Sequence, residues 1–185
     1  MNGDEDDKNP RREADEHDPA FWWLAARRLK HSADLAWAAG TVGGAGLARP
    51  TRVEQQLNTA FVFLAGLCLE YLAMAWLVDS GRPLDDLPNH RLRHLLERCA
   101  IEAAGEEQDL LRRAEAALQW HERFTIAEPV AEAALGEEAP QLGGWAAMLT
   151  PRHKAAFDSL FARLRARVAA RLDRRRGAGT TGPAD

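Results

Sequence analysis

Three residues with metal-ligating side chains follow one another at helical spacing in the middle of the chain. His90 and His94 are four residues apart, and Glu97 follows three residues later. On a helix this spacing places them on one face, as zinc and di-iron sites require. A closed site needs a fourth ligand, and di-metal sites in helical bundles repeat a Glu-x-x-His pair on a second helix, which this sequence lacks. We therefore predict no metal and no cofactor, and expect the two histidines at the solvent edge of a core.

Nucleophilic catalysis finds no support in the sequence. Cys68 and Cys99 each fall within an apolar helical pattern, and no Gly-x-Ser-x-Gly elbow occurs. Two buried-looking thiols indicate small core residues in a reducing compartment rather than a disulfide framework. The acidic start of the chain has no apolar run before Phe21, unlike a secretory signal peptide. Together these features predict a cytoplasmic protein.

Glu70 is the most unusual titratable residue, because it stands alone in the apolar stretch 60–78. A buried carboxylate is costly unless it is paired or hydrogen-bonded. We expect a structural pairing, either with an arginine of a neighbouring helix or in the polar seam of a dimer. A catalytic role is the less favoured alternative.

The element that positions Glu70 is a long apolar helix over residues 51–79. Thr51 and Glu54 form a capping-box pattern at its start, and Gly81 followed by Pro83 ends it. The stretch is just long enough to span a bilayer. Glu70 would then lie near the bilayer centre at a cost of about 2.5–3.5 kcal/mol. A core helix is therefore favoured over a membrane span, and no membrane partner is expected.

Apolar spacing predicts four further long helices and no strand. These cover residues 18–39, ended by Gly40, then 89–104, 107–124 and 151–176, with a short helix near 130–135. The expected fold is all-α, a four- to five-helix up-and-down bundle around the long central apolar helix. Its single domain spans 18–176, between a disordered acidic tail (1–17) and a flexible tail (177–185).

The last predicted helix carries an excess of arginine that invites a nucleic-acid interpretation. It holds seven arginines (163, 165, 167, 171, 174, 175 and 176) against two aspartates. Arginines at this density can bind a phosphate backbone. However, Phe157, Phe161 and Leu164 commit one face to packing, and no aromatic residues interleave the arginines to stack bases. A solvated helical face is the favoured interpretation.

Three segments, in this order, resemble the HEPN superfamily of helical bundles. They are Leu69-Glu70-Tyr71-Leu72 in the long helix, the start Asn89-His90-Arg91-Leu92-Arg93-His94-Leu95-Leu96, and the helix end Trp120-His121-Glu122-Arg123-Phe124. The resemblance covers residues 21–124. It implies a four- or five-helix bundle that is commonly a homodimer, often in toxin–antitoxin or phage-defence systems. Active members cleave RNA.

The sequence differs from that superfamily in the catalytic motif. The HEPN ribonuclease site uses an Arg and a His with four to six residues between them, and residues 18–176 hold no such pair. Phe124-Thr125 also replaces the usual Tyr-Pro. We therefore predict a non-catalytic interaction module that acts by self-association and by binding a partner protein, such as an antitoxin, or RNA. The alternative is a divergent, metal-independent ribonuclease.

These two hypotheses use different residues of the same region. Partner or RNA binding is assigned to five basic residues, Arg82, His90, Arg91, Arg93 and Arg123. The ribonuclease alternative would use Arg91, His94 and His121 in a rearranged site.

Overall fold

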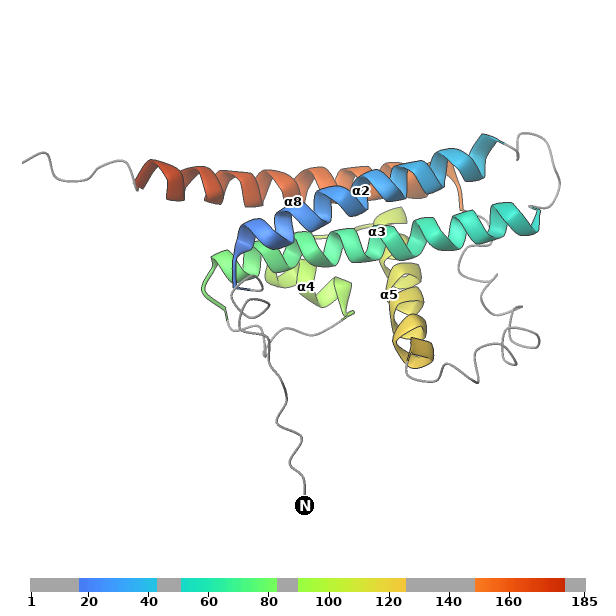
Figure 1. Cartoon of the computed structure of the whole chain (residues 1–185), viewed down its shortest axis with the longest axis horizontal. Coiled ribbons are helices and arrows are strands. Elements are labelled where there is room, and N and C mark those ends of the chain that lie inside the picture. The colour runs from blue at the N-terminus through green and yellow to red at the C-terminus, as the bar shows by residue number, and fades with distance from the viewer. Residues whose placement is uncertain (1–16, 43–50, 83–89, 126–148, 179–185) are drawn as a thin grey trace, which may run out of the picture.

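The computed structural model describes residues 17–42, 51–82, 90–125 and 149–178, and in these ranges the chain is all-α (Figure 1). The helices are α2 (Pro19–Val42), α3 (Arg52–Asp79), α4 (Leu92–Arg98), α5 (Glu106–Thr125) and α8 (Pro151–Ala178). The predicted all-α bundle around a long apolar helix is thereby confirmed. The expected short helix at 130–135 and the acidic tail up to residue 16 lie outside the described residues.

Helix α3 is the centre of the bundle, because it contacts each of the other four described helices. Helix α2 runs antiparallel along it, α8 lies alongside the pair, and α4 and α5 pack against the other side of α3 (Figure 1). Phe61 of α3 meets the ring of Trp37 from α2 at 5.1 Å and that of Phe157 from α8 at 5.7 Å. One apolar core therefore joins helices that are far apart in the sequence.

Among the described residues, Val53–Asp79 is the one stretch with the length and composition to cross a membrane. Of its most apolar window, 61% is buried inside the bundle. This degree of burial is expected of a central helix in a bundle. A helix that is apolar on most of its sides must pack against neighbouring helices on most of them.

Both predicted ends of α3 are confirmed. Thr51 Oγ1 accepts the Glu54 N–H at 3.3 Å, and Glu54 Oε2 accepts the Thr51 N–H at 2.6 Å, which completes the capping box. At the other end Gly81 has φ 72°, a backbone conformation that glycine adopts without strain. The N–H groups of Gly81 and Arg82 donate to the carbonyls of Val78 and Leu77, which is the Schellman pattern.

Two predicted boundaries are wrong. Gly40 does not end the first helix, which continues to Val42. Gly40 is instead a close-packing position, because a Cβ there would lie 3.2 Å from the Asn58 side chain and 3.3 Å from that of Leu57. The last helix also runs two residues beyond the predicted limit, to Ala178.

The helix expected over residues 89–104 is shorter, since α4 covers only Leu92–Arg98. Ala100 has φ 53°, and the Ile101 N–H donates back to the Leu96 carbonyl at 2.9 Å. This is again a Schellman stop, here with alanine in the position that glycine usually takes. A left-handed alanine carries no strong sequence signal, so the helix end could not be predicted from composition.

Four charged side chains join α2 to α8 in a closed square. Lys30 contacts Asp34 at 2.6 Å and Asp158 at 3.1 Å, while Lys154 contacts Asp158 at 2.5 Å and Asp34 at 3.1 Å. Burial opposes the charge on Lys30, but its hydrogen bonds to the two aspartates outweigh burial and raise its pKa. The square therefore stays ionised where the two helices meet.

Three arginines of α8, spaced four residues apart, are bound within the molecule. Arg163 donates to the Glu102 carbonyl at 2.7 Å, Arg167 to the Cys99 carbonyl at 2.9 Å, and Arg171 to Asp79 at 2.6 Å. Their guanidinium groups thereby donate hydrogen bonds to acceptors in the turn after α4 and at the end of α3. These three arginines are thus structural, whereas the sequence predicts a solvated face for them, because their acceptors lie far away in the sequence.

Replacing Arg171 with alanine should destabilise the fold strongly. The Asp79 side chain is 3% exposed, so the variant would leave a buried carboxylate without its guanidinium. We expect a loss of about 3 kcal/mol in the free energy of unfolding, measured by urea denaturation. Arg174→Ala is the matched control, because exposed Arg174 bonds only to the Ala170 carbonyl of its own helix in the described structure. Equal losses in both variants would contradict the structural role of Arg171.

Candidate functional site

The buried carboxylate of Glu70 is paired with His90, not with an arginine. Glu70 is 5% exposed on α3. Its Oε1 accepts the backbone N–H of His90 at 2.9 Å, and its Oε2 lies 3.0 Å from His90 Nδ1. The expected structural pairing of Glu70 is therefore present, with a histidine as the partner. The two contacts hold both the backbone and the ring of His90.

His90 lies before α4 and not on it, with φ 57°. Histidine is among the residues that adopt this left-handed conformation most readily, and the two bonds to Glu70 stabilise it. The predicted helical face shared by His90, His94 and Glu97 therefore does not exist. His94 and Glu97 are both exposed, and His94 Nδ1 lies 3.8 Å from the Glu97 carboxylate. In the described ranges no group of three ligating side chains could hold a metal.

The geometry fixes which nitrogen of His90 can react. A carboxylate only accepts hydrogen bonds, so Nδ1 carries the proton that points at Glu70. Nε2 of the neutral ring is then a lone-pair acceptor on the opposite edge, and the side chain is 24% exposed. A carboxylate-oriented imidazole of this kind is suited to accept a proton from a substrate hydroxyl.

Several basic residues were assigned to the same site as His90, and they differ in what holds them. Arg91 and His94 are exposed. Arg93 is fixed, since its backbone N–H donates to Glu115 Oε1 at 2.8 Å and its Nε donates to Glu115 Oε2 at 2.9 Å. Arg82 is exposed at the end of α3. The segment 90–94 therefore combines one oriented imidazole with exposed cationic side chains, and such cations can attract an anionic ligand.

For two of the predicted residues, the structure gives only the helix to which they belong. His121 and Arg123 belong to α5, but their side chains lie outside the described residues.

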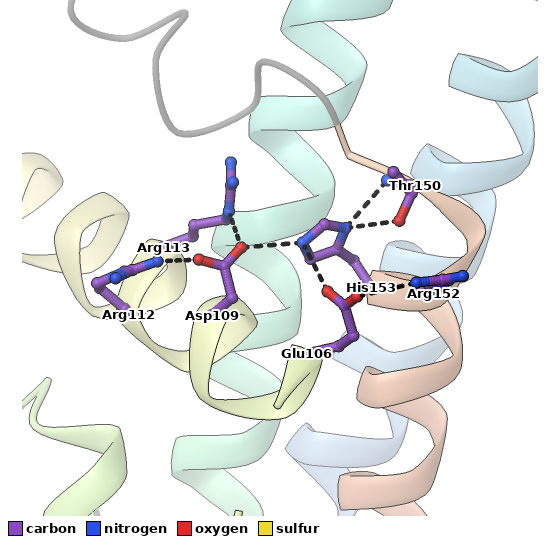
Figure 2. A network of polar contacts seen from close by, with 7 residues as sticks. All are labelled: Glu106, Asp109, Arg112, Arg113, Thr150, Arg152 and His153. Atoms are coloured by element: carbon purple, nitrogen blue, oxygen red, sulfur yellow. Dashed lines mark hydrogen bonds and ion pairs between the residues drawn. The ribbon is translucent and has the colours of Figure 1, made fainter. Parts of the chain in front are cut away.

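A second polar network, which the sequence did not reveal, joins the first turns of α5 and α8 (Figure 2). His153 is 5% exposed, and its Nδ1 lies 3.0 Å from both the backbone nitrogen and Oγ1 of Thr150. Its Nε2 lies 3.0 Å from Asp109 Oδ2 and 3.7 Å from Glu106. Because the Thr150 N–H can only donate, Nδ1 accepts and Nε2 donates to Asp109. Both ring nitrogens are thus occupied.

Asp109 is the hub of this network. Burial would raise the pKa of its carboxyl, but hydrogen bonds from Arg113, His153 and Arg112 outweigh burial and hold the pKa well below its usual range. Figure 2 shows the two arginines and His153 meeting the carboxylate from opposite sides. An anion enclosed by donors in this way is a structural hub and offers no free proton acceptor to a substrate.

A local sequence signal for His153 does exist. It lies three residues after Thr150, where a capping box would place Glu or Gln. The ring takes the role of that side chain by accepting the Thr150 N–H. The contact to Asp109, 44 residues earlier in the chain, has no such signal.

The two cysteines are unsuited to nucleophilic chemistry, as expected. Cys68 and Cys99 are buried, and burial raises the pKa of each thiol to about 12. Cys68 lies 3.3 Å from the Ala26 carbonyl, so it takes part in the α2–α3 contact. At neutral pH both sulfurs are protonated core groups.

No protein-family model, no curated protein and no solved structure matches this chain. The HEPN resemblance therefore stays a prediction that depends on three short motifs.

Asp109→Asn should remove an acid-sensitive part of the stability. A depressed native pKa stabilises the fold above the unfolded-state pKa of about 3.8, and this contribution is lost as the pH falls below that value. At neutral pH we expect the variant to lose about 1–3 kcal/mol. Its stability should also fall less steeply than that of the wild type on acidification, as followed by thermal melts. Exposed Asp173→Asn is the control, and an identical pH profile for wild type and Asp109→Asn would contradict the assignment.

Proposed function

We propose that this protein is a non-catalytic helical interaction module that acts by self-association. The observation that supports this function is an apolar stripe on α3 that its own bundle covers only in part. The stripe consists of the half-buried residues Ala60, Leu67, Tyr71 and Val78, spaced four or seven apart.

The position of the stripe is fixed by the contacts on either side of it. On one side, the Tyr71 ring meets Trp22 of α2 at 5.1 Å between centroids. On the other side, Glu70 holds His90 just before α4. The stripe therefore lies between α2 and α4, away from the α8 contact that Phe61 makes.

The stripe contains no charged residue, although 28% of the whole chain is charged. In a two-fold dimer the same patch faces itself, so a charge near the axis would meet its own copy. An apolar, charge-free patch avoids that repulsion and gains the free energy of burying side chains such as Leu67 and Val78. A second copy of the chain is therefore the partner that suits this face.

The HEPN resemblance supports the same function from the sequence side, because such bundles are commonly homodimers. It also suggests a cytoplasmic, toxin–antitoxin or defence setting, with an antitoxin or RNA as a further partner. Arg82, Arg91 and Arg93 are the described arginines assigned to that partner, and Arg91 is the exposed one closest in sequence to the oriented His90.

Leu67→Glu should convert the dimer to a monomer. The substitution would bury two like charges per dimer, and we expect a weakening of roughly 100-fold, with helical content unchanged. Light scattering coupled to size exclusion, across a concentration series, measures this. Gln119→Glu adds the same charge at an exposed position of α5 and should remain dimeric. A wild-type protein that is monomeric throughout the series would refute self-association.

A second candidate function is metal-independent RNA cleavage, favoured by the Glu70–His90 pair. Nε2 of His90 would take the proton from a ribose 2′-hydroxyl, whose oxygen then forms a bond to phosphorus. The bond from phosphorus to the 5′-oxygen breaks, and exposed His94 supplies the proton to that leaving oxygen while Arg91 binds the phosphate.

His90→Ala should abolish such cleavage if this second function is correct. We expect a loss of at least about 100-fold on purified total RNA, with Glu70→Gln reducing the rate and shifting its pH profile. His94→Ala and His121→Ala test the other two histidines. His31→Ala, which alters an exposed histidine on α2, is the control and should cleave normally. Absence of cleavage by the wild type would eliminate the enzyme and leave the interaction module.

A further inference from the structure

A second face, on the outside of α2, exposes large apolar side chains in a regular pattern. Phe21, Leu24 and Leu35 are 43%, 47% and 58% exposed. With Arg28, His31 and Ala38 they form a three–four repeat at positions 21, 24, 28, 31, 35 and 38, all exposed. This is the spacing of a coiled-coil seam, where every third or fourth residue faces a partner helix.

The described bundle does not occupy this face. Helix α2 packs on α3 through buried Ala26 and Ala33, and it reaches α8 through Lys30 and Asp34. The seam residues are all exposed and therefore lie on a different side of α2 from these contacts. Arg28 and His31 form no ion pair with other described residues. Large apolar side chains that recur along one exposed face of a helix are typical of an interaction site.

The charge of this face identifies the kind of partner. Exposed α2 residues include Arg27, Arg28 and His31 and not one carboxylate, although the whole chain has 28 acidic against 24 basic residues. The one acidic residue of α2, Asp34, is held by Lys30 and Lys154. A partner that covers the face must supply carboxylates from its own side.

A second copy of α2 cannot supply them. In a parallel pair at full overlap, Arg28 would lie opposite Arg28, and His31 opposite His31. In an antiparallel pair, Arg28 would lie opposite His31 of the other copy. Neither arrangement gives the guanidinium a carboxylate, and a desolvated guanidinium without a carboxylate is costly. Polar residues at core positions of a seam typically select one partner and one register.

We propose that the outer seam of α2 binds an acidic amphipathic helix of another protein. Its leucines would cover Phe21, Leu24 and Leu35, and its carboxylates would meet Arg28, His31 and the flanking Arg27. This site is separate from the α3 stripe, so a dimer and the acidic partner can bind at the same time.

Two synthetic amphipathic peptides test this site directly. They share the same leucine seam and differ only in carrying Glu or Lys at the core and flanking positions opposite Arg27, Arg28 and His31. Fluorescence anisotropy with the full-length protein should show the Glu peptide binding at least about tenfold more tightly than the Lys peptide, with affinity falling as salt increases.

Variants of the seam make the test specific. Arg28→Glu with His31→Glu should reverse the preference between the two peptides, and Leu24→Ser with Leu35→Ser should weaken both by at least about tenfold. These side chains are exposed, so melting temperatures should remain close to wild type.

Two controls separate this site from the rest of the molecule. Arg165→Glu on the exposed side of α8 should not change peptide affinity. Leu67→Glu, which tests the dimer, should bind the Glu peptide as the wild type does. The proposal is overturned if neither peptide binds, if the two bind equally, or if the charge-reversed variant keeps the wild-type preference.

Discussion

Buried carboxylates on the most apolar helix are the constraint that organises this bundle. Glu54, Glu70 and Asp79 of α3 are each less than 10% exposed, in surroundings where an unpaired charge would cost several kcal/mol. Each one is met by a donor that fixes a different part of the chain. Glu54 accepts the Thr51 N–H and closes the start of its own helix, Glu70 fixes the backbone and ring of His90, and Asp79 binds Arg171 of α8. The polar groups therefore determine where neighbouring segments dock, while apolar packing supplies most of the stabilisation.

The sequence predicts the features that depend on local interactions, and it misses those that depend on contacts between residues far apart in the chain. The capping box at Thr51 and the stop at Gly81 are local, and both were predicted at the correct residues. The start of α4 was not predicted correctly. His90 takes its left-handed conformation while it is bonded to Glu70, which lies 20 residues earlier in the chain. For the same reason Glu70 was expected to face an arginine or the polar seam of a dimer and not His90, since a sequence pattern does not pair side chains across helices. The network at Asp109 depends on His153, 44 residues away, and was missed entirely.

Among the described residues, His90 and His153 each lie 3.0 Å from a carboxylate oxygen, and their surroundings give them different chemical capacities. His153 is enclosed, with one nitrogen accepting the Thr150 N–H and the other donating to Asp109, so its ring is a fixed structural link. Among the described residues, His90 is held only through its backbone N–H and Nδ1, which leaves Nε2 as an acceptor on a side chain that is 24% exposed. A histidine–carboxylate contact is thus weak evidence for catalysis by itself, because the decisive feature is what the second nitrogen meets.

The hairpin of α2 and α3 presents two apolar faces that the described bundle leaves at least partly exposed, and their charges lead to opposite conclusions about partners. The stripe on α3 is free of charge, so a copy of itself meets no electrostatic penalty. The seam on α2 places Arg28 and His31 among its apolar residues, which excludes self-pairing at full overlap and requires carboxylates from elsewhere. Hydrophobic area drives both associations, but it does not discriminate between partners, because burial is non-directional. In this protein the presence or absence of two cationic side chains within each face supplies that discrimination.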